Sequence, residues 1–206
     1  MVATRNSIQS KKPRLKVPDY LVYELIDGKP IFYKGYREVM SGEKTFSEIM
    51  GSSTLQSFIV TYLVVFIAKR LDESLYTLLT SEAGLHLDRR NNLAGDILIF
   101  DNATLPITAI NQNYADVPPK IVIEVDIAAD PTDISPGSYV FQKTQKLVSF
   151  GVEKVIWVTT DSKKVTIATS GDDDWLIKDW HKDVEIMDGI TVNIGQYLTQ
   201  KGSPYA

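Results

Sequence analysis

The stretch IVIEVD, Ile121–Asp126, decides the fold. Four of its six residues are β-branched and apolar, which predicts a strand covered on both faces inside a mixed or parallel sheet. Glu124 stands in the middle of this run, and a buried carboxylate without a partner is costly. It must therefore be paired, hydrogen-bonded or bound to a metal ion. Because side chains alternate along a strand, Glu124 and Asp126 are expected to share a face, where two acids could grip a metal.

Two further charges stand in apolar surroundings. GDILIF, Gly95–Phe100, predicts a second apolar strand, and its acid, Asp96, stands at the start. SYVFQKTQKLVSFG, Ser138–Gly151, predicts a helix that begins with a serine cap after a Pro-Gly pair. Lys143 falls on the apolar side of this helix, so it either reaches an edge or meets a buried acid. The simplest interpretation is a structural ion pair with Glu124, but the three charges together suggest a site.

The order and spacing of these charges resemble the PD-(D/E)XK nuclease superfamily, and more closely the Uma-two family, which is grouped with its endonucleases. The resemblance covers about residues 19–195. The matching pieces are YELIDG at Tyr23–Gly28, Asp96, PKIVIEV at Pro119–Val125, and Lys143, Leu147, Gly151, Val152, Val155, Ile156 and Trp157. Each piece alone is a weak signal, whereas the ordered set is fairly specific.

The resemblance implies an α+β, restriction-endonuclease-like fold with a mixed sheet flanked by helices. It implies an Mg²⁺ or Mn²⁺ site formed by Asp96, Glu124 and the backbone carbonyl of Val125, and oxygen ligands suit these hard cations. Lys143 would orient the attacking water or stabilise negative charge on a DNA phosphate. The accessory candidates are Glu24, Asp126 and Gln56. For Glu24 a cross-strand ion pair is at least as good an interpretation, and Asp126 is either an added ligand or a partner of Lys143.

The chain also departs from the family pattern. Lys120 replaces an Asp, Leu147 replaces a Tyr, and Gln56 stands where many members have a His. Tyr139 stands where an Asp often precedes the helical lysine, and Asp126-Ile127 replaces a Leu-Ser pair. These departures keep a second hypothesis open, a non-catalytic nucleic-acid-binding or assembly module that retains the fold. A third is a structural homodimer.

Length and charge add further constraints. The 206 residues suit one domain with a substantial core, and the lack of Cys excludes disulfides and thiolate metal sites. This fits a reducing cytoplasm. Residues 1–18 hold five of the 22 bases and no acid, so residues 19–206, the predicted domain, carry 17 bases against 26 acids, a net charge of −9. The basic arm is expected to be a solvated tail more readily than a phosphate-binding segment.

Local patterns fill in the remaining expectations. Tyr20–Asp27 and Ile31–Lys34 predict a hairpin with Asp27-Gly28 in its turn. Thr54–Leu71 predicts a buried helix, because its apolar run is too short to span a bilayer. The long segment 102–119 carries Leu105, Ile107 and Ile110 in a loop, which favours a homodimer contact.

Overall fold

The computed structural model describes residues 16–130 and 135–206. Most of the predicted basic arm, up to residue 15, lies outside the described residues. Within them, no helix is long and apolar enough to cross a membrane.

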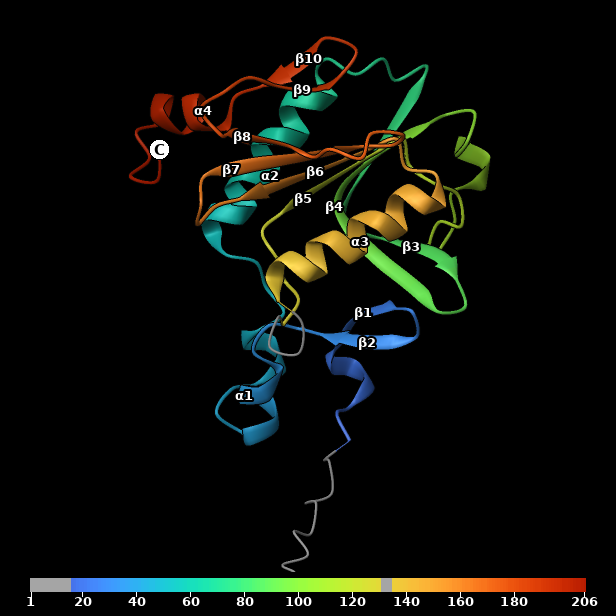
Figure 1. The fold of residues 1–206 in the computed structure, drawn as a ribbon, viewed down its shortest axis with the longest axis vertical. Coiled ribbons are helices and arrows are strands. Elements are labelled where there is room, and N and C mark those ends of the chain that lie inside the picture. The colour runs from blue at the N-terminus through green and yellow to red at the C-terminus, as the bar shows by residue number, and fades with distance from the viewer. Residues whose placement is uncertain (1–15, 131–134) are drawn as a thin grey trace, which may run out of the picture.

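A mixed eight-stranded sheet forms the centre of this part of the chain (Figure 1). Seven strands follow in the order β2-β1-β4-β5-β6-β7-β8, and β3 pairs with β4 outside that path. Only β5 and β6 pair in parallel among these strands; the other neighbours are antiparallel. The strands are β1 (Val22–Ile26), β2 (Lys29–Phe32), β3 (Tyr76–Asp88), β4 (Asn91–Asp101), β5 (Ile121–Val125), β6 (Lys154–Thr159), β7 (Lys164–Thr169) and β8 (Leu176–Asp179).

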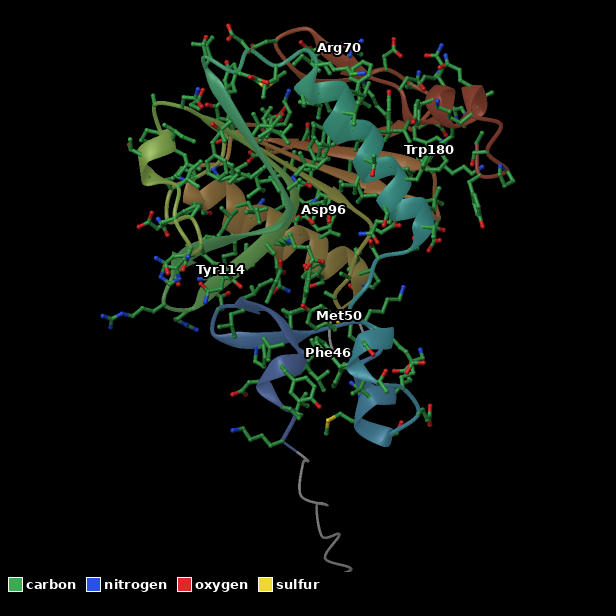
Figure 2. The ribbon with its side chains drawn as sticks, turned by 180° about the vertical axis from the view of Figure 1, so that it is seen from behind. Phe46, Met50, Arg70, Asp96, Tyr114 and Trp180 are labelled. Atoms are coloured by element: carbon green, nitrogen blue, oxygen red, sulfur yellow. The ribbon has the colours of Figure 1, made fainter. Side chains whose placement is uncertain are left out.

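Two long helices cover the two faces of the sheet. Helix α3 (Pro136–Phe150) lies in front of it in Figure 1, and α2 (Thr54–Ala68) comes to the front in the reversed view of Figure 2. Helix α3 joins β5 to β6, as a parallel pair requires, since a short turn cannot connect two parallel strands. The predicted neighbours, the strands that contain Asp96 and Ile121, do lie side by side between these helices.

Alternation along the central strands creates one core on each side. The core on the α2 side includes Ile59, Leu63, Ile67, Ile97, Ile99, Ile121, Ile123 and Val125, and the core on the α3 side includes Leu98, Phe100, Val122, Leu147, Val155 and Trp157. Each fully buried aliphatic side chain contributes about 1.5–3 kcal/mol to the free energy of folding. Because Asp96 and Glu124 alternate with residues of the α2-side core, both carboxylates belong to the α3 side of the sheet.

The hairpin expected near the N-terminus is present as β1 and β2. Its turn residues Asp27 and Gly28 have φ angles of 54° and 73°, the left-handed values that a two-residue hairpin turn requires. Arg90 holds this turn from the neighbouring β3–β4 turn, through its backbone carbonyl to the Gly28 N–H and its guanidinium to the Asp27 carbonyl. The hairpin is thereby joined to the central sheet.

Three local expectations were wrong. Helix α3 begins at Pro136, capped by Ser135 rather than Ser138, because a proline fits the first helical turn, where no N–H bond is needed. Asp96 does not open its strand, because β4 already starts at Asn91. The sequence predicts two strands at Tyr76–Ser81 and Gly84–Asp88, whereas β3 is a single strand that contains a bulge between Thr80 and Ala83.

Smaller elements surround the sheet. The hairpin of β9 (Val184–Met187) and β10 (Ile190–Val192) forms a separate two-stranded sheet and packs with α4 (Ile194–Gln200) against α2. Helix α1 (Tyr36–Ser41) lies beyond β2, and 3-10 turns occupy Asp19–Leu21, Phe46–Glu48 and Ile107–Ala109. The sequence predicts a short final helix at about Gly195–Leu198, and α4 confirms it, whereas α1 and the β9–β10 hairpin were not predicted.

Candidate functional site

The two predicted metal-binding carboxylates lie on adjacent strands. Ile97 of β4 pairs with Ile123 of antiparallel β5, so the preceding Asp96 lies next to Glu124. The side chain of Asp96, near the middle of the view in Figure 2, accepts a hydrogen bond at Oδ2 from the Val125 N–H at 2.7 Å. This bond fixes one carboxylate oxygen of Asp96 and leaves the other available.

Lys143 reaches the same face from α3. Its Nζ lies 2.9 Å from Glu124 Oε1 and 2.7 Å from Glu24 Oε1, and the lysine is fully buried. The rings of Tyr23, Tyr139 and Trp157 surround the ammonium at 5.6–5.9 Å from their centroids. The expected ion pair with Glu124 is therefore present, and a second carboxylate shares the lysine.

That second carboxylate, Glu24, is fixed at both oxygens. Oε1 accepts the Ala94 N–H at 3.0 Å, and Oε2 accepts the Tyr139 hydroxyl at 2.6 Å. The cross-strand ion pair considered for Glu24 is wrong, because its cationic partner comes from α3. Tyr139 was noted only as a departure from the family pattern. Its position one helical turn before Lys143 was a signal that both share a face.

The charges around the lysine do not balance. Three carboxylates, Glu24, Asp96 and Glu124, face one ammonium, a formal excess of two negative charges. Burial raises the pKa of Glu124 to about 8; Lys143 opposes this rise, and Asp96 and Glu24 add to it. Burial also raises the pKa of Asp96, against the Val125 hydrogen bond and Lys143. Burial alone would lower the pKa of Lys143, but Glu124 and Glu24 raise it well above its usual value, so the lysine stays protonated.

The chemistry of this donor set fits Mg²⁺ or Mn²⁺. Within residues 16–130 and 135–206, no three His, Asp or Glu side chains are grouped to hold a metal, so Asp96 and Glu124 would act as a pair. Mg²⁺ is commonly bound by one or two carboxylates while it keeps several waters. Glu124 Oε1 and Lys143 Nζ are buried and, despite their ion pair, lack an aligned hydrogen bond in the described structure. A water bound to such a cation would donate a hydrogen bond to the Glu124 carboxylate, in addition to its ion pair with Lys143.

Gln56 lies at the opposite side of the strand end. Its Nε2 donates to the Val125 carbonyl oxygen at 2.7 Å, from the first turn of α2. The accessory candidate therefore holds the very carbonyl that was predicted as a metal ligand. A carbonyl oxygen has two lone pairs, so this bond leaves one acceptor position on Val125.

Asp126 does not share the face of Glu124. Strand β5 ends at Val125, and Asp126 turns away with a φ of 62°. Its two oxygens accept hydrogen bonds from the N–H and the hydroxyl of Thr160, each at 2.8 Å. The expected alternation fails because the strand has already ended, and the proposed role of Asp126 as a partner of Lys143 is wrong.

A cleft of about 650 Å³ opens beside this cluster. Gln56, Asp126, Thr160 and Glu82 are among its lining residues. Sequence reasoning missed Glu82, which sits with Ser81 in the β3 bulge opposite Asp96; the two have φ angles of 53° and 68°. Bulges of this kind re-aim side chains near active sites. Burial and the Asp96 carboxylate raise the pKa of Glu82.

Comparisons with known proteins support the fold. No protein-family model and no curated protein matches the chain. A solved structure from Anabaena variabilis, described as "a putative nuclease belonging to DUF820", matches with a TM-score of 0.63 and 15% identity over 85% of this chain and 89% of that one. The Uma-two resemblance itself stays a prediction. The predicted α+β fold, a mixed sheet flanked by helices, is confirmed as nuclease-like.

Proposed function

We propose that the chain is a metal-dependent nuclease that hydrolyses phosphodiester bonds of DNA at Asp96, Glu124 and Lys143. The observation that carries this proposal is the placement of both carboxylates on adjacent strands, on the face that receives the α3 lysine. The nuclease-like fold adds support, because the solved structure that resembles it is described as "a putative nuclease".

Each residue has a distinct task in the proposed reaction. Asp96 and Glu124 would hold Mg²⁺ or Mn²⁺, with the Val125 carbonyl as a further ligand. The bound cation would supply an activated water at neutral pH and would screen charge on the phosphate. Lys143 would stabilise the negative charge that develops in the transition state. Glu24, fixed by Ala94 and Tyr139, keeps the ammonium in position from the other side.

Plasmid nicking tests this proposal directly. Supercoiled DNA should be nicked with Mg²⁺ or Mn²⁺, and activity should fall by at least about a hundredfold in Asp96→Asn and in Lys143→Ala. The matched controls are Asp101→Asn, five residues along the same strand, and Lys146→Ala, one turn along the same helix on its solvent side. Both controls should nick like the parent protein. Equal loss in control and test variants would contradict the assigned residues.

A non-catalytic module with the same fold is the second candidate function. The complete burial of Lys143 between Glu24 and Glu124 favours it, because a closed ion-pair cluster can serve stability alone. Such a module would bind no Mn²⁺ at the cluster and would leave DNA uncut. Weak DNA binding that falls steeply with salt, without cleavage, would select this alternative.

A further inference from the structure

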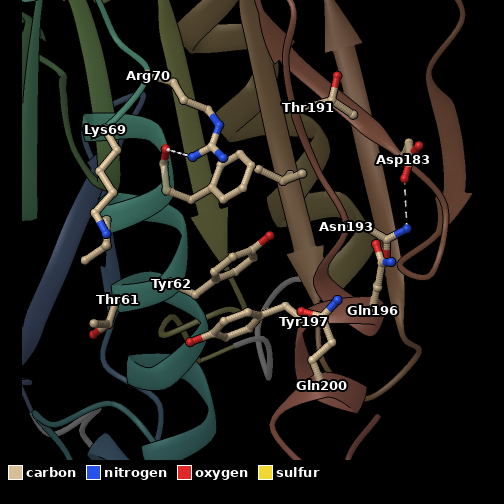
Figure 3. A pocket seen from close by; sticks show the side chains of 13 residues that line it. Thr61, Tyr62, Lys69, Arg70, Asp183, Thr191, Asn193, Gln196, Tyr197 and Gln200 are labelled. Carbon is tan, nitrogen blue, oxygen red and sulfur yellow. Dashed lines mark hydrogen bonds between the residues drawn. The ribbon is translucent and has the colours of Figure 1, made fainter.

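A second groove lies away from the carboxylate cluster, between α2 and the segment that contains β10 and α4. It encloses about 700 Å³ (Figure 3). Its lining residues are Thr61, Tyr62, Val65, Phe66, Lys69, Arg70, Asp183, Thr191, Val192, Asn193, Gln196, Tyr197 and Gln200. Aliphatic side chains are a small part of this list, and aromatic rings, amides and cations predominate.

Four aromatic rings form a continuous ladder: three of them, Tyr62, Phe66 and Tyr197, line the groove, and Phe58 extends the ladder beyond the groove lining. Tyr62 and Tyr197 lie face to face in Figure 3. Their ring centroids are 3.7 Å apart and their planes are 10° from parallel. Phe66 continues the ladder beside Tyr62, and Phe58 stacks on Tyr197 at 5.6 Å. Phe58 is 40% exposed, so the ladder ends on a ring that solvent reaches.

Cations accompany this ladder. The guanidinium of Arg70 lies 3.6 Å from the Phe66 ring centroid, and its Nη1 donates to the Phe66 carbonyl. The Nζ of Lys201 lies 5.5 Å from the centroid of Tyr197, and exposed Lys69 lines the groove. The acid Asp183 is bound at Oδ1 by Asn193. Three bases gather here although residues 19–206 carry a net charge of −9.

Helix α2 links this groove to the candidate site. Gln56, in its first turn, holds the Val125 carbonyl beside Glu124, and Phe58 follows two residues later. At 1.5 Å per residue, Tyr62 lies about 9 Å and Phe66 about 15 Å along the helix axis from Gln56, and Arg70 follows just after the helix ends. Ser52 and Ser53, at the start of the helix, already line the cleft beside the site. A chain laid along α2 would thus pass from the groove to the cleft at the end of β5, next to the strand face that bears the carboxylates.

We propose that this groove binds single-stranded DNA, with bases stacked against the aromatic ladder and phosphates against Lys69, Arg70 and Lys201. Rings beside cations are the means by which proteins hold single strands without sequence preference. This inference rests on the proposed function, because the unpaired strand in the groove would be the part of the DNA substrate that leads to the cleavage site. A second copy of this chain is the less suitable occupant, since the groove is rich in cations and amides rather than in aliphatic side chains.

Fluorescence anisotropy with a labelled oligothymidylate of about 15 nucleotides tests the inference, in EDTA so that nothing is cleaved. Phe58→Ala should weaken binding by about tenfold through lost stacking. Phe141→Ala is the matched control, because Phe141 is also an exposed helical ring, stacked on Trp175 at 5.7 Å. It should bind like the parent protein. Arg70→Gln should weaken binding and should reduce the slope of log K against log salt by about 0.7. Arg89→Gln, in the exposed β3–β4 turn, should do neither.

The outcomes separate this inference from the proposed function. Normal binding by Phe58→Ala and Arg70→Gln would overturn the groove assignment, even if the protein nicks plasmid. Equal weakening by Phe141→Ala would also overturn it. Loss of self-association in Phe58→Ala, with oligonucleotide binding unchanged, would assign the groove to a second copy instead. Binding that depends on Phe58 but persists in a protein without nicking activity would support the groove and contradict the nuclease proposal.

Discussion

The Nζ of Lys143 lies 2.7 Å from Oε1 of Glu24, and both side chains are buried. At the surface, Lys146 and Asp27 form an ion pair of nearly the same length, 2.6 Å. Both pairs join helix α3 to the β1–β2 hairpin. One pair is shielded from water and the other is not. The two pairs therefore give a direct comparison of what burial does to an ion pair.

Glu24→Gln should lower the free energy of unfolding by about 3 kcal/mol, because it removes a carboxylate in direct contact with a buried ammonium. Asp27→Asn should lower it by less than about 1 kcal/mol, since water screens the exposed pair. Urea unfolding of both variants at pH 7 measures the difference. Similar losses for the two would mean that Glu24 is not the main counter-charge of Lys143.

Stability should fall as the pH rises from about 5 to 8 in EDTA. The pKa of Glu124 is about 8 in the folded protein against an ordinary value of 4.5, because burial disfavours its charge. Its contribution is fully present below pH 4.5 and is lost as the pH approaches 8, and the raised pKa of Asp96 acts in the same direction. Lys143 stays protonated throughout this window.

Glu124→Gln isolates this effect. The variant should unfold with a flatter pH dependence, and at pH 8 it should exceed the parent protein in stability by a few kcal/mol, since 1 pKa unit corresponds to about 1.4 kcal/mol. Unfolding in urea at pH 5.5, 6.5 and 8 checks it. An unchanged slope in the variant would show that another group is responsible.

Much of this arrangement could be predicted from local sequence. The apolar runs around Glu124 and Asp96 identified two neighbouring strands, and helical periodicity placed Lys143 on the inner face of α3. Long-range contacts could not be predicted in this way. Nothing near Glu24 indicates that Tyr139 donates to it, because that contact depends on how α3 packs on the sheet.

Departures of the backbone from regular strand geometry also limited what could be predicted from the sequence. Alternation predicts faces only while a strand continues, so the left-handed turn at Asp126 moved its carboxylate to Thr160. The bulge that brings Glu82 opposite Asp96 is likewise a deviation from period two. Both Asp126 and Glu82 line the cleft beside the site.

The homodimer expected at residues 102–119 stays a prediction, and the structure shows which of these residues are exposed enough to form the contact. Leu105 is only 7% exposed and belongs to the core, whereas Ile107 is 77% exposed. Ile107→Asp should weaken a dimer at least about tenfold. Ile177→Asp, on the exposed edge strand β8, is the control and should leave assembly unchanged. If sedimentation shows that the parent protein is a monomer at high concentration, the dimer hypothesis is wrong.

Titration calorimetry with Mn²⁺ is the measurement that tests the central claim most directly. The parent protein should bind with micromolar to millimolar affinity, and Asp96→Asn and Glu124→Gln should each lose that binding. Lys143→Ala should keep it or tighten it, because the variant removes the cation that competes for Glu124, while nicking activity is lost. Asp101→Asn should bind like the parent. If all of these proteins bind Mn²⁺ equally, or none binds it, Asp96 and Glu124 do not form a metal site, and the nuclease proposal fails with them.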